Sequence, residues 1–113
     1  MGTAKNTKNK IEFYELEKVK FIVKDACGID IAYAYEDLVF SEHGLFIIQF
    51  LENSKELGCW FNKECLEQNK VSMFNSLAKS ATLNKLELKY KGKFEMSQKA
   101  NSEEIDIQFT EVI

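Results

Sequence analysis

The chain has 113 residues and a formal net charge of −3, and 45% of its residues are hydrophobic. A chain of this length and apolar content forms one packed domain, which excludes an intrinsically disordered protein. The acidic balance argues against nucleic acid and anionic membranes as partners, because both attract basic proteins. No apolar run approaches the roughly 20 residues of a spanning helix, and the N-terminus lacks an apolar signal core. We therefore expect a cytoplasmic protein that does not bind membranes.

The first segment of the chain fits two secondary structures. Residues 1–9 are polar and predict a flexible tail, which leaves one domain over residues 10–113. Within residues 10–26, four apolar side chains recur at helical spacing: Leu16, Val19, Val23 and Ala26. The same segment also alternates apolar residues with lysines, which is typical of a strand. A helix ending at Gly28 is favoured, because glycine commonly stops helices, but the strand remains possible.

The rest of the chain predicts a meander, a helix and a hairpin. Apolar residues alternate with period two in four segments: 29–35, 38–42, 45–51 and 57–61. Glu36-Asp37 and His43-Gly44 are suited to tight turns between the first three of these segments. Asn62 is a good N-cap for a helix that ends near residues 82–84. Two further strands close the sequence. The predicted fold class is α+β, an antiparallel β-meander with an N-terminal helix, a central helix and a C-terminal β-hairpin.

The turns also predict registers. They pair Tyr33 with Phe40 and Phe40 with Ile47, so these side chains share one sheet face, which we expect the helices to cover. A loop at 52–56 adds three residues to that face: Leu57, Cys59 and Phe61. The same registers place Gly58 opposite Phe50, and a loop at 99–102 places Gly92 opposite Phe109. An aromatic ring over a cross-strand glycine is a known way of covering a weak strand position.

A second apolar face follows from these registers. It holds five large residues: Val39, Phe46, Ile48, Phe50 and Trp60. Left bare, they would expose about the largest apolar patch that monomers tolerate. Either the N-terminal segment or the last hairpin folds over them, or they form the interface of a homodimer or a protein partner. Aromatic anchors dominate such interfaces, so these five residues are the predicted partner-binding set.

The cysteines give little sign of chemistry. Cys59 and Cys65 are five residues apart, and His43 is the only histidine. Structural zinc usually requires four ligands and a tighter cysteine pair, so no metal or other cofactor is expected. An odd count of three cysteines fits a reducing compartment. If Cys65 lies in the first helical turn after Asn62, the helix dipole would favour its thiolate. An incidental cysteine is the simpler interpretation.

The order of elements over residues 10–113 resembles the fold of type III secretion chaperones and their bacterial relatives. This resemblance implies a dimer that binds an extended segment of a client protein. Because no catalytic motif is present, our leading hypothesis is a non-enzymatic binding or adaptor domain that self-associates or binds a partner through its second sheet face. A small-molecule carrier or small enzyme is the alternative, with a cavity lined by Tyr33, Tyr35 and Cys59. A thiol-redox role for Cys65 is a third possibility.

Overall fold

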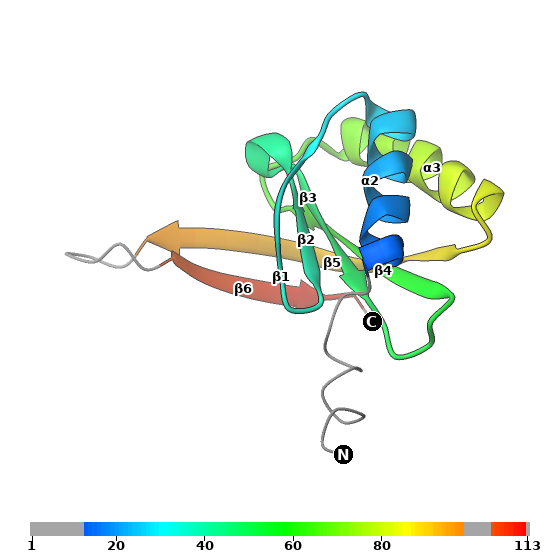
Figure 1. Cartoon of the computed structure of the whole chain (residues 1–113). Coiled ribbons are helices and arrows are strands. Elements are labelled where there is room, and N and C mark those ends of the chain that lie inside the picture. Colours follow the sequence, from blue (N-terminus) through cyan, green and yellow to red (C-terminus); the bar gives the residue numbers. More distant parts are fainter. Residues whose placement is uncertain (1–12, 99–104, 113) are drawn as a thin grey trace, which may run out of the picture.

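The computed structural model describes residues 13–98 and 105–112 (Figure 1). In chain order its elements are α2 (Phe13–Cys27), β1 (Ile31–Tyr35), β2 (Leu38–Ser41), the 3₁₀ turn η1 (Glu42–Gly44), β3 (Phe46–Phe50), β4 (Glu56–Asn62), α3 (Glu67–Leu83), β5 (Glu87–Gln98) and β6 (Ile105–Glu111). The α+β class and the C-terminal hairpin are confirmed. The predicted tail at 1–9 and the predicted loop at 99–102 lie outside the described residues.

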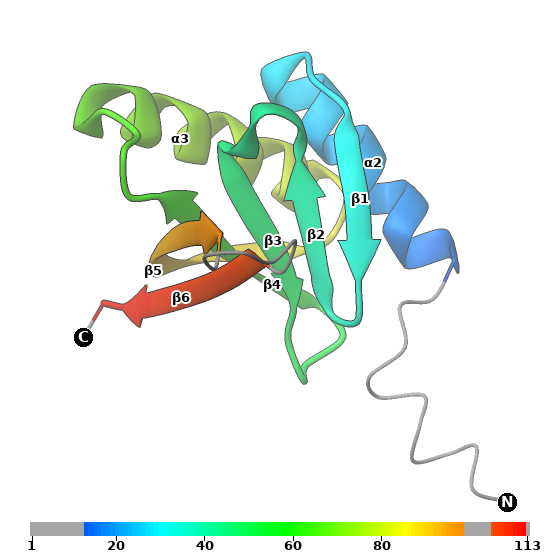
Figure 2. The same cartoon turned by 90° about the vertical axis from the view of Figure 1, so that its left-hand side faces the viewer.

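The strands of the described chain form one mixed sheet in the order β1-β2-β3-β4-β5-β6. The first four strands are antiparallel neighbours, β4 and β5 are parallel, and β6 returns antiparallel to β5. A parallel pair needs a crossover, and α3 supplies it between β4 and β5. Both helices lie on one side of the sheet, and the β5–β6 hairpin extends from the other side (Figures 1 and 2). We call these sides the helix-side face and the hairpin-side face.

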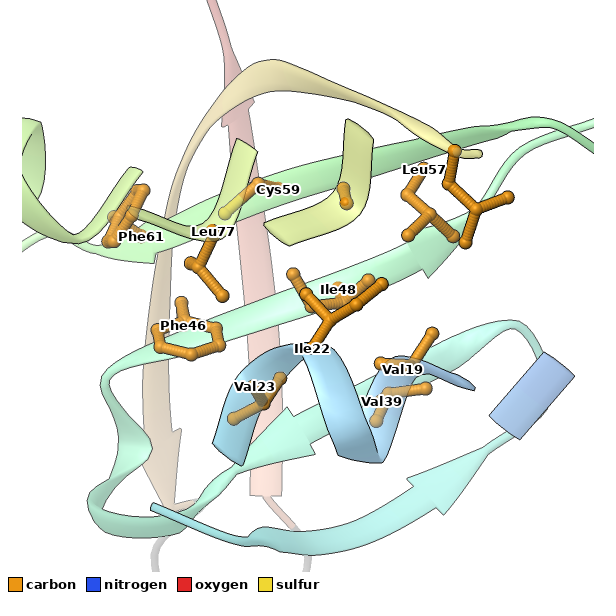
Figure 3. Packing of buried hydrophobic residues seen from close by; sticks show 12 residues of the cluster. Val19, Ile22, Val23, Val39, Phe46, Ile48, Leu57, Cys59, Phe61 and Leu77 are labelled. Atoms are coloured by element: carbon orange, nitrogen blue, oxygen red, sulfur yellow. The ribbon is translucent and has the colours of Figure 1, made fainter. Parts of the chain in front are cut away.

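The helix interpretation of the first segment is confirmed. Val19 and Val23 are fully buried, whereas Phe21 between them is 57% exposed. A strand would place all three side chains on one face, but a helix points the middle one away from the other two. The helical stripe of α2 packs with α3 on the helix-side face of the sheet (Figure 3). The strand residues of this core are Val39, Phe46, Ile48, Leu57, Cys59 and Phe61.

The predicted registers are right for the first two hairpins and wrong for the third. Tyr33 pairs with Phe40, and Phe40 pairs with Ile47, as the turns predict. Between β3 and β4, however, Gly58 lies opposite Gln49 and not Phe50. The connecting loop ends one residue earlier than expected, because the Leu51 N–H donates to the carbonyl of Glu56, where β4 already begins. A shift of one residue exchanges the faces of a strand pair.

This shift changes which residues lie under the helices. The predicted covered face joined Phe40 and Ile47 of the second and third strands to Cys59 of the fourth. In the structure, Phe40 and Ile47 share the hairpin-side face with Trp60. Cys59 instead lies across from Ile48 in the helix-side core. The meander therefore has two apolar faces, as predicted, but their members are exchanged in β2 and β3.

A bulge in β5 redirects the last hairpin. Tyr90 pairs with Cys59 and Gly92 pairs with Trp60, so Lys91 is an extra residue on the β5 side. An inserted residue inverts the alternation of side chains along the strand. Tyr90 therefore packs with the helix-side core, whereas Phe94 belongs to the hairpin-side cluster. The predicted single parity from Leu86 to Met96 fails for this reason.

Gly92 permits this geometry. Its φ of +149° lies in a region that favours glycine, and a Cβ there would overlap the carbonyl oxygen of Thr110 on β6. Gly92 lies opposite Glu111, while Phe109 pairs with Phe94. The predicted pairing of Gly92 with Phe109 is therefore wrong by two residues. The glycine serves the close approach of two backbones and is not a weak position covered by a ring.

We predict that Gly92→Ala lowers the free energy of unfolding by about 2–4 kcal/mol, because strain at φ is added to overlap with backbone. Gly28→Ala is the matched control. Gly28 also has a positive φ of +74°, but nothing lies within 4 Å of the added Cβ, so a cost of about 1 kcal/mol is expected. Urea unfolding followed by tryptophan fluorescence measures both. Equal costs for the two variants would contradict the close approach at Gly92.

Candidate protein-binding face

A second, smaller core lies on the hairpin-side face. Its buried members are Phe40, Ile47, Trp60 and Phe94, and Leu38 and Ile107 pack against them. The hairpin covers this core, which Figure 2 shows from its own side: β6 crosses in front of the central strands. Both coverings that the sequence left open are observed, for different residues: the last hairpin covers Trp60, whereas the N-terminal helix α2 packs over Val39, Phe46 and Ile48.

One row of apolar side chains runs across the hairpin-side face. Cross-strand pairs connect Tyr33, Phe40, Ile47 and Trp60 on four successive strands. The Trp60 ring then meets the Phe109 ring of β6 edge-to-face, with centroids 4.7 Å apart. At the other end of the row, the Tyr33 ring stacks on Phe40 with centroids 4.4 Å apart. We call these five residues the apolar row.

The row is buried in its middle and open at its ends. Phe40, Ile47 and Trp60 are buried, whereas Tyr33 is 53% exposed and Phe109 is 39% exposed. Further large side chains on the same face are also exposed: Tyr35, Met96 and Ile105. These three share the face because they pair with Leu38, Ile107 and Gln98, respectively. The hairpin therefore covers the centre of the face and leaves an apolar margin on β1 and on β5–β6.

A chain of hydrogen bonds fixes the centre of this face. The Trp60 indole N–H donates to Gln49 Oε1 over 3.0 Å, and Gln49 Nε2 donates to Asp37 Oδ2 over 3.0 Å. A buried indole N–H requires an acceptor, and Gln49 provides it from the neighbouring strand. Asp37 fixes the amide orientation of Gln49 in turn. The tryptophan is therefore held in one position beneath Phe109.

The predicted partner-binding set does not form one exposed surface. Val39, Phe46 and Ile48 are buried in the helix-side core, and Phe50 packs against that core from its edge. Trp60 is the one member on the hairpin-side face, where it is buried. The shift of one residue between β3 and β4 is the cause. The exposed apolar residues of the second face are instead Tyr33, Tyr35, Met96, Ile105 and Phe109, none of which belongs to the predicted partner-binding set.

The expected cavity is not assembled either. Tyr33 and Tyr35 point to the hairpin-side face, and Cys59 is buried on the helix side of the same sheet. The three side chains therefore cannot line one space. A hollow of about 220 Å³ does lie between α2 and α3, where Asp25, Ser76, Lys79 and Leu83 line it. Ser80 at this hollow donates its hydroxyl to Asp25 Oδ2 over 2.9 Å, so these two polar groups satisfy each other.

Cys65 lies outside the helix. The helix α3 begins at Glu67 with Leu66 as its N-cap, four residues after Asn62, the N-cap that the sequence predicts. Asn62 caps a tight turn instead, because its Oδ1 accepts from the Glu64 N–H over 2.9 Å. Burial raises the pKa of the Cys65 thiol, Lys70 opposes this shift, and Glu67 adds to it. The thiol is therefore less ionised than a free cysteine, contrary to the predicted activation.

The neighbouring charged groups do not activate Cys65. Lys70 Nζ lies 2.9 Å from Glu67 Oε1 and donates to the Tyr90 hydroxyl over 3.2 Å. The hydrogen bonds to Glu67 and Tyr90 raise the pKa of Lys70, which keeps it protonated.

The other two cysteines show no sign of activation either, because burial raises the pKa of Cys27 and of Cys59. Among the described residues, no group of three or more His, Cys, Asp or Glu side chains is placed to hold a metal ion.

Comparisons with known proteins assign this chain to no group. No protein-family model matches it, no curated protein matches its sequence, and no solved structure matches its fold at a significant level. In the part of the chain that the structure describes, neither helix is long and apolar enough to cross a membrane. Function must therefore be inferred from the surface itself.

We predict that Cys65 reacts with iodoacetamide more slowly in the folded chain than in the urea-unfolded chain near pH 7, because the thiolate is the nucleophile and its fraction falls as the pKa rises. Peptide mass spectrometry assigns the label to each cysteine. The fully buried Cys59 is the internal control and should stay unlabelled until the chain unfolds. Faster labelling of Cys65 in the folded state would restore the thiol-redox hypothesis.

Proposed function

We propose that this chain is a non-enzymatic protein-binding domain that contacts its partner through the margin of the hairpin-side face. One observation carries the proposal: the apolar row crosses the sheet with a buried middle and two exposed aromatic ends, Tyr33 and Phe109. Rigid aromatic side chains are typical anchors of protein interfaces, since they bury a large area at little cost in conformational entropy. The hydrogen-bonded Trp60 beneath Phe109 holds that anchor in place before binding.

A protein partner fits this surface better than a small molecule. The exposed apolar residues lie on three strands, at both margins of a face whose middle is filled. Small ligands bind in concave sites that enclose most of their surface, whereas an extended polypeptide can contact separate anchors. Exposed apolar residues gathered on one face are also the usual mark of a protein interface. A client-binding or adaptor role, with a partner protein or a second copy of the chain, is the proposed class.

A reducing compartment such as the cytoplasm is the proposed location. All three cysteines are free, and their raised pKa values argue against a thiol-exchange role. Free thiols are usual where glutathione keeps cysteines reduced.

We predict that Tyr33→Asp removes a stoichiometric partner that co-purifies with the wild-type chain. The substitution places a charge at an exposed apolar anchor, and hot-spot truncations typically cost about 2 kcal/mol or more of binding free energy. Val71→Asp is the matched control, because Val71 is exposed on α3, away from this face. Quantitative mass spectrometry of affinity-purified wild type and both variants measures the difference. A partner lost equally from both variants, or retained by Tyr33→Asp, would contradict the proposal.

A further inference from the structure

The strand β1 is an edge that carries no charge of its own. It is the first strand of the sheet, so one side of its backbone faces no other strand of the described chain. Its sequence is Ile-Ala-Tyr-Ala-Tyr, and every residue from Ala32 to Tyr35 is exposed. Both faces of the strand are therefore open, since Ala34 points to the helix side and Tyr33 to the hairpin side.

Natural sheets protect such edges with charged side chains, prolines or bulges, because bare edges pair with other strands. The opposite edge of this sheet follows the rule, since β6 carries Asp106 and Glu111. In β1 a bulge between Ile31 and Tyr33 disturbs the beginning of the strand. The stretch from Tyr33 to Tyr35 is regular and has no protecting residue. This part of the edge lacks the usual protection, whereas the other edge of the sheet carries charges, so it is a position where another strand can dock.

Charge marks the two ends of this edge. Asp30 precedes β1, and Glu36 and Asp37 follow it. Asp30 lies 3.4 Å from Lys24 Nζ, and Asp37 accepts a hydrogen bond from Gln49, whereas the Glu36 side chain is exposed at a turn with φ of +55°. The edge therefore has an uncharged aromatic centre with acidic groups at both ends.

We infer that the β1 edge receives an extended segment of a partner protein as an added strand, with apolar residues in its centre and basic residues at its ends. This inference rests on the proposed function and names the class of partner. Main-chain hydrogen bonds provide affinity in such strand addition, and alternate side chains provide specificity. Every second side chain of the added strand would lie beside Tyr33 and Tyr35 and extend the apolar row by one strand. Its terminal lysines or arginines would meet Asp30 and Glu36.

A second copy of this chain fits the edge less well. The antiparallel register with the greatest overlap is centred on Tyr33, and it would place Asp30 of each copy opposite Glu36 of the other. Like charges directly opposite each other destabilise a strand pair. Registers that avoid this contact shorten the pairing on an already short strand. The charges at the ends of β1 therefore favour a basic partner over self-pairing.

The test measures binding of fluorescein-labelled peptides to the full chain by fluorescence anisotropy. The probe is Lys-Val-Thr-Phe-Thr-Val-Lys, and its matched controls replace both lysines with glutamates or the central phenylalanine with proline. We expect the lysine peptide to bind at least about tenfold more tightly than either control, a difference of about 1.4 kcal/mol. Added salt should reduce the advantage over the glutamate peptide, because exposed charges are screened. Equal affinities, or no binding of the lysine peptide, would overturn the inference.

Two chain variants locate the site. Ala34→Lys places a protecting charge on β1 and should lower the affinity for the lysine-ended probe peptide by about tenfold or more. Gln108→Lys makes the same addition to the exposed face of β6 and should leave binding unchanged. Equal effects of the two variants would overturn the assignment to β1. Circular dichroism checks that both variants fold, which is expected because both positions are exposed.

Two further results separate this inference from the proposed function. Phe109→Asp removes the anchor at the far end of the apolar row and should release the natural partner as Tyr33→Asp does. A partner retained by Phe109→Asp would contradict the binding face, whereas the peptide measurements decide the β1 edge. Suppose that a natural partner is lost on Tyr33→Asp but retained by Ala34→Lys. This result would support the proposed binding face and contradict strand addition at the β1 edge. Size-exclusion chromatography with light scattering tests self-pairing. A wild-type dimer that becomes monomeric in Ala34→Lys would mean that a second copy occupies the edge, and the inferred partner chemistry would be wrong.

Discussion

The bulge at Lys91, with Gly92 beside it, is the constraint on which the hairpin-side face depends. Up to Tyr90, β5 runs parallel to β4 and adds its side chains to the helix-side core. One extra residue then inverts the alternation, and Phe94 enters the opposite core. Gly92 allows β6 to approach so closely that a Cβ would overlap the Thr110 carbonyl oxygen. Without this inversion, Phe94 would point to the helix side, and the cluster around Trp60 would lose one of its four buried members.

The result is a sheet with two cores of unequal size. The larger one lies between the sheet and the two helices, which cover it in the usual manner of an α+β domain. The smaller one is covered by a two-stranded hairpin of the same sheet, which is narrower than a helix layer. Such a cover buries the centre of the face and leaves side chains at its margins exposed. The exposed Tyr33 and Phe109 are thus a consequence of how the small core is closed, and they are available to a partner.

The sequence predicts local pairings well and the assignment of faces poorly. The connections at Glu36-Asp37 and at His43-Gly44 are short, and the pairs derived from them, Tyr33 with Phe40 and Phe40 with Ile47, are confirmed, although η1 forms the second connection. The longer connection after β3 has no such signature. Because β3 and β4 are apolar on both faces, the hydrophobic pattern does not distinguish two registers that differ by one residue. Trp60 was thus assigned to the correct face, whereas Val39, Phe46 and Ile48 were not.

The existence of a second apolar face could be predicted from the sequence, but the residues exposed on it could not. A second apolar face follows from the alternation in β3, and it exists. Its exposed residues, however, depend on the parallel β4–β5 pair and on the bulge, and both are contacts between distant segments. Lys91 lies in an unbroken alternation of lysines with other residues, so nothing local marks it as extra. The prediction that Cys65 lies in the first helical turn failed for a related reason, since Asn62 is equally suited to capping a turn or a helix.

The most direct test of this account is whether the Trp60 and Phe109 rings touch in solution. Nuclear Overhauser spectroscopy of the isotopically labelled chain detects protons of neighbouring rings, and the two ring centroids lie 4.7 Å apart. We expect cross-peaks between the Trp60 indole and the Phe109 ring, together with cross-peaks between Tyr33 and Phe40. Cross-peaks from Trp60 to Val19 or Leu77 on the helices, with none to Phe109, would place Trp60 on the helix side and contradict the account.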